Sequence, residues 1–189
     1  SLGVEVFEVP RGGDVTWHGP GQLVGYPIVA LDRVNRDLHR WLRTLEEALI
    51  RALSRHGIVS ERSPGRTGVW VENRKIASLG VAVRRWVGYH GFALNVSPDL
   101  SGFSLIHPCG LKGVQMTSMA AELGSAAPTL EAMREDVTQE FSKLLGYERV
   151  VPAPAAAARQ WLEREAPAAE DQPGTAPGPE ARTGGIPTW

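Results

Sequence analysis

Cys109 is the only cysteine of the chain and stands in the segment His107-Pro108-Cys109-Gly110. A lone cysteine is more often a small buried hydrophobic residue than a nucleophile. Here Pro108 restricts the backbone on one side, Gly110 exposes it on the other, and the surrounding loop is a place that a substrate reaches. A thiol with an ordinary pKa of about 8.5 is only about 3% thiolate at neutral pH, so a nucleophilic Cys109 needs a nearby base or positive charge.

Four side chains are candidates for that partner: Lys75, His18, His90 and His107. Lys75 is distinguished by the composition, because 17 of the 20 basic residues are arginine and only three are lysine. An arginine does not release its proton near neutral pH, so a lysine in a core-strand position indicates that a removable proton is needed. The alternative is a surface lysine at the exit of a hairpin.

Residues 11–26, RGGDVTWHGPGQLVGY, hold five glycines and one proline. Glycines allow positive φ and let a ligand approach main-chain N–H groups. One interpretation is a turn-rich connection between two strands. Glycine, histidine and amide groups beside apolar positions are more typical of a small-molecule site.

Further small residues suggest a groove in a sheet. Ala77, Ser78 and Gly80 on a middle strand are expected to face Gly91 and Ala93 on the returning strand. Larger side chains there would close the sheet surface. The alternative is close packing beneath a helix.

Alternating apolar residues predict strands, and apolar residues three and four apart predict helices. We expect strands at 2–9 and 23–31 and three antiparallel strands within 68–96, helices at 38–53 and from the Thr129 cap to Gly146, and a loop at 101–118. His39 and His56 are expected to be ordinary surface or cap residues.

The 189 residues, 42% of them hydrophobic, suffice for one sizeable core. We expect one domain over residues 1–151 and a mostly disordered tail over the Pro-, Ala- and Gly-rich residues 152–189. A net charge of −1 gives no reason to expect nucleic acid, and the longest apolar run, nine residues, is too short to cross a membrane. A single cysteine excludes a disulfide within the chain and fits a reducing cytoplasm.

Three blocks resemble the lipoate-protein ligase B family, the octanoyltransferases, in the expected order: RGGDVTWHGPGQLVGY at 11–26, RKIASLGVAVRRWVGYHGFALNV at 74–96 and HPCGLKGVQMTSM at 107–119. The resemblance implies an α+β core like that of biotin and lipoate protein ligases, with a mixed or antiparallel sheet flanked by helices. It implies transfer of an octanoyl group from acyl carrier protein to a lysine of lipoyl domains, in 2-oxoacid dehydrogenase E2 subunits and the glycine cleavage H protein. This is the first step of protein lipoylation. The family implies no ATP, metal or other cofactor, and we expect a cytoplasmic monomer.

The resemblance also implies roles for residues. Cys109 would carry the acyl group as a thioester, and Lys75 would be its partner in a catalytic dyad. The substrate contacts would be Arg11, Gly12, Gly13, Asp14, Val15, Thr16, Trp17, His18, Ser78, Leu79, Gly80, Gly91, Phe92 and Ala93. The family usually carries a few dozen residues, with a strand and a helix, before the first block, so this segment is expected to be missing from the sequence. The Pro- and Ala-rich tail is also outside the family pattern.

The implied reaction is consistent with the chemistry of its groups. A thioester converted to a second thioester and then to an amide needs no nucleotide, and the covalent intermediate separates two encounters with large carriers. An ammonium at Lys75 would favour the Cys109 thiolate and could protonate the departing thiol, and the neutral amine could deprotonate the incoming lysine. Three alternatives remain open: an ATP-dependent lipoate or biotin ligase, a cysteine thioesterase using His107 or His18, and a non-catalytic carrier-binding module.

Residues 62–85 carry a surplus of five positive charges. We expect this face to meet the acidic acyl carrier protein and charge reversal of Arg84 and Arg85 to slow acyl loading. The charged residues are Arg62, Arg66, Arg74, Lys75, Arg84 and Arg85, against the single acid Glu72.

Overall fold

The computed structural model describes residues 4–13, 15–34, 36–106 and 114–153. Contacts divide the chain into one compact unit, Ser1–Val150, and a second, Val151–Trp189. The first unit holds all the helices and strands reported below. None of the helices among the described residues has the length and apolar character needed to cross a membrane. The expected disordered tail lies almost wholly outside the described residues, so its state stays a prediction.

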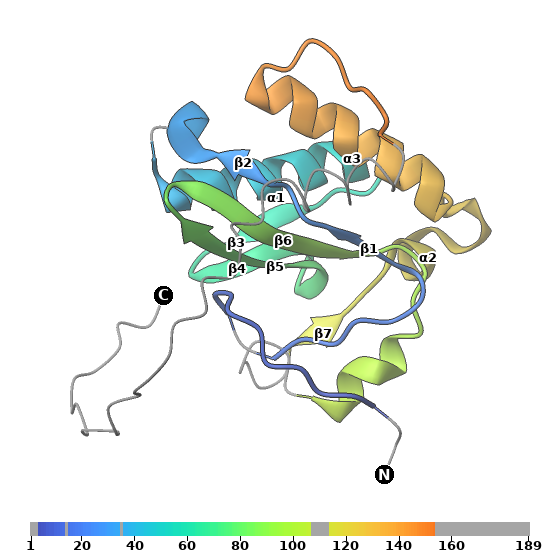
Figure 1. Ribbon diagram of the computed structural model, residues 1–189. Helices are drawn as coiled ribbons and strands as arrows, with labels where there is room; N and C mark the ends of the chain where they lie inside the picture. The colour runs from blue at the N-terminus through green and yellow to red at the C-terminus, as the bar shows by residue number, and fades with distance from the viewer. Residues whose placement is uncertain (1–3, 14, 35, 107–113, 154–189) are drawn as a thin grey trace, which may run out of the picture. The chain divides into compact units, whose positions relative to one another are not determined.

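A mixed sheet of seven strands, counted over the described residues, forms the centre of the first unit (Figure 1). Its antiparallel order is β1-β6-β5-β4-β3; β2 also pairs with β6, and β7 runs parallel to β5. The strands are β1 (Gln22–Gly25), β2 (Val29–Ala30), β3 (Glu61–Ser63), β4 (Arg66–Val71), β5 (Arg74–Arg84), β6 (Val87–Asn95) and β7 (Gln115–Met116). This arrangement confirms the expected sheet class.

Two long helices, α1 (Leu38–Ser54) and α3 (Leu130–Leu145), lie together on one face of the sheet (Figure 1). The side chains of Asp37 and Thr129 accept hydrogen bonds from N–H groups of the first turns, and Gly146 ends α3 in the left-handed conformation. Both expected helices are confirmed within one or two residues. The short elements are η1 (Leu31–Val34), η2 (Leu100–Leu105), α2 (Met119–Leu123) and η4 (Gly124–Ala126).

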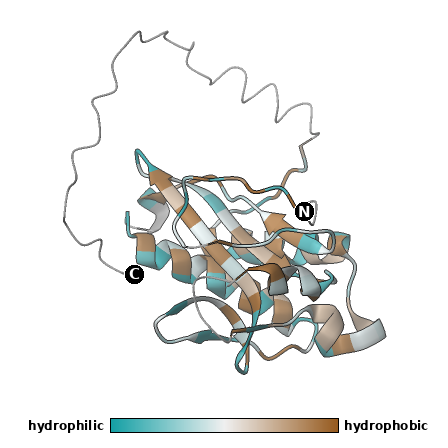
Figure 2. Ribbon diagram, turned by 90° about the horizontal axis from the view of Figure 1, so that it is seen from below, coloured by the Kyte–Doolittle hydropathy of each residue, from teal (hydrophilic) through white to brown (hydrophobic). Residues whose placement is uncertain are grey.

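The hydrophobic core fills the space between these helices and the sheet. Leu45 and Leu49 of α1 are fully buried, as is Val69 of β4. Phe92 of β6 stacks on Phe141 of α3, with their ring centroids 5.9 Å apart. The opposite face of the sheet is covered by the N-terminal segment and η2 (Figure 1). Figure 2 views the molecule from this side.

The strand expected at 2–9 is wrong: the described residues 4–9 form no strand, and Val6 and Phe7 are largely exposed. Alternation permits a strand but does not supply the hydrogen-bonded neighbour that a strand needs. The expected strand 23–31 is divided into β1 and β2 at Pro27, which has no N–H to donate. The expected loop 101–118 includes most of η2 and the whole of β7, and β3 was missed altogether.

Candidate active site

Lys75 lies near the start of β5, where a shift in strand register decides which way its side chain points. Val69 pairs with Ala77 and Trp70 pairs with Lys75, so Ile76 is an extra residue without a partner on β4. In a regular strand, Lys75 would share a face with Ala77, beneath the helices. The extra residue reverses the alternation and places Lys75 on the opposite face, with Trp70 and Ser78.

The surroundings of Lys75 exclude the alternative of a surface lysine. The residue is only 2% exposed, and its Nζ lies 5.4 Å from the ring centroid of Trp70. Gly68 makes room for it: a Cβ on Gly68 would lie 2.4 Å from Lys75 Cε. The carbonyl oxygen of Lys75 accepts a hydrogen bond from the N–H of Thr117 (3.0 Å), immediately after β7. The side chain of Lys75 is therefore buried, and its backbone is held by the neighbouring strands.

A cavity of about 690 Å³ lies against the sheet face that is turned away from α1 and α3. Twelve of the 14 predicted substrate contacts line it: Arg11, Gly13, Val15, Thr16, Trp17, His18, Ser78, Leu79, Gly80, Gly91, Phe92 and Ala93. Gly12 is outside the lining and donates its N–H to the carbonyl of Val81 (2.9 Å), and Asp14 lies outside the described residues. The structure brings these residues together; their role in binding stays a prediction.

The small residues of β5 and β6 allow neighbouring segments of the chain to come close to these strands. Gly80 pairs with Gly91; a Cβ on Gly80 would lie 2.8 Å from Arg11 Cδ, and one on Gly91 would lie 2.2 Å from the carbonyl oxygen of Gly25. Ala77 does not belong to this group, because it is buried in the core between the sheet and the helices. The proposed groove is thus lined by Ser78, Gly80, Gly91 and Ala93 but not by Ala77.

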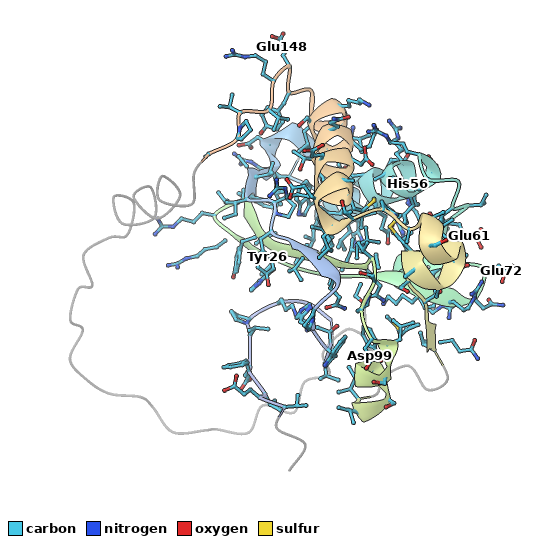
Figure 3. All side chains as sticks on the ribbon, turned by 90° about the vertical axis from the view of Figure 1, so that its right-hand side faces the viewer. Tyr26, His56, Glu61, Glu72, Asp99 and Glu148 are labelled. Atoms are coloured by element: carbon cyan, nitrogen blue, oxygen red, sulfur yellow. The ribbon has the colours of Figure 1, made fainter. Side chains whose placement is uncertain are left out.

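Several residues of the lining were missed as substrate contacts. They are mostly apolar, and five of them come from residues 4–9, which form no strand, so nothing in the sequence marks them as cavity residues. His90, named only as a possible partner of the cysteine, also lines the cavity. The missed residues are Val4, Glu5, Val6, Phe7, Val9, Val24, Tyr26, His90, Leu105 and Ile106. Figure 3 shows Tyr26 near the sheet and Asp99 beside η2, away from His56 at the end of α1.

Cys109 and His107 lie outside the described residues, but both flanks of their segment are placed. Ile106, before the segment, lines the cavity. Met116, after it, pairs with Lys75. The part of the chain that the structure describes contains no group of three or more acidic, histidine or cysteine residues that could hold a metal ion.

The structure does not place the six basic residues of 62–85 on one surface. Arg62 pairs with acids of α1 (2.6 Å to the nearest oxygen), and Arg74 pairs with an acid of α2 (2.7 Å). Lys75 is buried. Arg84 and Arg85 lie at the far end of β5, about 30 Å from Lys75 at about 3.3 Å per residue. The expected basic face is therefore wrong as one continuous surface.

The sequence model of one protein family, the lipoyl protein ligase A/B catalytic domain, matches residues 1–142 of this chain. The chain belongs to this family. An octanoyltransferase of Geobacter metallireducens is 53% identical over 143 residues, which are 76% of this chain and 67% of the relative. One of Christiangramia forsetii is 51% identical over 143 residues, 73% of this chain and 61% of the relative. The chain spans about two thirds of the length of these curated relatives of the lipoyl protein ligase A/B family.

Solved structures confirm the fold of the family. A bi-partite lipoate protein ligase from Thermoplasma acidophilum matches with a TM-score of 0.59 and 17% identity, over 82% of this chain and 64% of that one. A biotin protein ligase from Aquifex aeolicus matches with a TM-score of 0.53 and 15% identity, over 67% of this chain and 53% of that one. The expected biotin and lipoate protein ligase core is confirmed.

Proposed function

We propose that this protein transfers an octanoyl group from acyl carrier protein to a lysine of lipoyl domains, through a thioester on Cys109 with Lys75 as its partner. The likeness to octanoyltransferases at about half identity supports the reaction. The observation that carries the dyad is the buried Lys75, which the register shift turns onto the cavity face of the sheet. The lipoyl domains of E2 subunits and the H protein are the proposed acceptors.

Chain geometry supports a meeting of Cys109 with Lys75. Three residues span at most about 11 Å, so Cys109 is held within that distance of Ile106, which lines the cavity. Lys75 does not itself line the cavity, but Ser78, three residues further along β5 and at most about 10 Å away, does. Met116 attaches the other flank of the segment to Lys75 itself.

The cavity supports an acyl substrate. Its lining is mostly apolar, and its volume of about 690 Å³ is in the range of small-molecule sites. Against the ATP-dependent alternative, residues 11–26 contain no lysine that could hold an adenylate phosphate. We therefore propose a reaction without ATP or metal.

Intact-protein mass spectrometry after incubation with octanoyl acyl carrier protein tests this function. We expect the mass of the protein to increase by one octanoyl group and to return to its original value when a lipoyl domain is added. Cys109→Ser should gain no mass, because a hydroxyl of ordinary pKa does not replace the thiolate. Mass gain that depends on ATP and octanoic acid, or free acid in place of an adduct, would establish the ligase or the thioesterase instead.

For docking of acyl carrier protein, Arg66 is a better candidate than the distant Arg84 and Arg85. Its guanidinium lies 4.1 Å from the ring centroid of Trp70, the same ring that Lys75 approaches. We expect Arg66→Ala to slow acyl loading severalfold at low salt and to weaken its salt dependence, because charge steers the encounter.

The comparison variants are Arg66→Lys, which keeps the charge, and Arg84→Ala combined with Arg85→Ala. Stopped-flow loading at two salt concentrations measures all three. A loading rate in Arg66→Ala equal to wild type, or a larger loss in the double variant, would contradict this assignment.

A further inference from the structure

A chain of hydrogen bonds connects the cavity to the backbone next to Lys75. Gln22 and Asn95 are cross-strand partners of β1 and β6, and Gln22 Nε2 donates to Asn95 Oδ1 (2.8 Å). Asn95, only 1% exposed, donates from Nδ2 to the carbonyl of Thr117 (2.9 Å). At the other end, His18 Nδ1 lies 3.1 Å from Gln22 Oε1, which also accepts from the N–H of Gly19 (3.2 Å).

Backbone groups at both ends fix the direction of this chain. A carbonyl only accepts, so Asn95 must present its amide nitrogen to Thr117 and its oxygen to Gln22. A backbone N–H only donates, so Gln22 must present its oxygen to Gly19. His18 Nδ1 faces that same oxygen and must therefore carry a proton. In the neutral imidazole, Nε2 is then the unprotonated nitrogen.

The proton balance of the proposed transfer calls for such a group. An incoming lysine arrives as an ammonium and ends as an amide, so its nitrogen loses two protons. Lys75 becomes a neutral amine when it protonates the departing carrier thiol, and it then has room for one proton only. A second acceptor is required. His18 lines the cavity and is exposed, so it can pass a proton to solvent, whereas Lys75 is 2% exposed.

We propose, building on the function proposed above, that His18 Nε2 accepts the first proton of the acceptor lysine, with Gln22 and Asn95 as positioning residues. The free amine forms the C–N bond to the thioester carbon. The adduct gives its second proton to Lys75, which becomes an ammonium again, and the C–S bond breaks with Cys109 leaving as a thiolate. The imidazolium of His18 releases its proton to solvent.

Other ionisable groups of the described residues face the same cavity, namely Glu5, Arg11, Tyr26 and His90. Asp99 belongs to the segment that packs on Trp17 through Phe103, and hydrogen bonds from the backbone and side chain of Ser101 lower the pKa of its carboxyl. Among the contacts of the described residues, neither Glu5 nor Asp99 makes a hydrogen bond to His18. The tautomer of His18 is therefore set by its contact with Gln22.

The tautomer is tested without catalysis. Nitrogen-15 NMR of the full chain with labelled histidine, assigned by loss of the signal in His18→Asn, should show His18 protonated at Nδ1 at a pH where the ring is neutral. Gln22→Met should abolish this preference, because the accepting oxygen is gone. A neutral His18 protonated at Nε2 in the wild-type protein would overturn the proposal.

Single-turnover kinetics test the proton step. In His18→Asn, transfer to the lipoyl lysine should slow at least about 100-fold, and by much more than acyl loading does. In Gln22→Glu, a carboxylate beside the imidazole favours the protonated ring, so the acidic limb of the transfer rate should move up by about one pH unit. His39→Asn, on the exposed surface of α1, is the matched control and should change neither rate.

Transfer in His18→Asn that is slowed no more than loading would overturn this proton step alone. Failure of the wild-type protein to form an acyl adduct on Cys109 would overturn the proposed function and this step together.

Discussion

Lys75→Arg should still form acyl-enzyme, more slowly than wild type, but should fail to pass the octanoyl group to the lipoyl lysine. A guanidinium keeps the positive charge that favours the Cys109 thiolate, but it neither gives nor takes a proton near neutral pH. We expect loading within about 100-fold of wild type and transfer slowed by more than about 1,000-fold, within the range of general acid–base catalysis. Rapid-quench mass spectrometry, which follows formation and decay of the acyl-enzyme separately, measures both steps.

Lys75→Met is the matched comparison, because it fills nearly the same space without a charge. This variant should lose loading as well as transfer, since no cation favours the thiolate. Melting temperatures of both variants show whether the packing against Trp70 and Gly68 survives. Wild-type transfer by Lys75→Arg would refute the proton-carrying role and leave Lys75 as a counter-charge only.

The sequence predicted those parts of the fold that depend on local patterns. The helices followed from apolar spacing with Thr129 and Gly146 at the ends, and the hairpin of β5 and β6 followed from two alternating runs. The segment 4–9 has the same alternation but forms no strand. Pairing is a property of two segments, and one segment's pattern does not reveal whether the second exists.

The composition of the site was more predictable than its geometry. Lys75 was selected because lysine is rare in this chain, yet the side on which it emerges depends on the unpaired Ile76. A one-residue shift reverses the facing of every residue beyond it, and apolar Ile76 carries no sign of a bulge. The directed bonds from Thr117 to His18 were equally invisible, because they need two strands in register.

Gly68→Ala should remove both stability and activity, because this glycine is needed for two reasons at once. Its φ of +135° is rarely adopted by other residues, and an added Cβ would lie 2.8 Å from the carbonyl oxygen of Ala77 as well as 2.4 Å from Lys75 Cε. Its N–H also donates to the buried carboxylate of Glu46 (3.1 Å). We expect a loss of about 2 to 4 kcal/mol in the free energy of unfolding, from strain and overpacking together.

Gly65→Ala is the matched control, in the preceding turn between β3 and β4. Its φ is also positive, +72°, but an added Cβ would meet no atom within 4 Å. This variant should lose only about 1 kcal/mol and keep its activity, because backbone strain acts there without any clash. Denaturant unfolding measures the two free energies, and acyl loading at a temperature where both variants are folded measures function. Gly68 lies against Lys75 and Gly65 does not, so a difference in loading between folded Gly68→Ala and Gly65→Ala reports the displacement of the Lys75 side chain. Equal loading in the two would show that the position of Lys75 does not depend on Gly68.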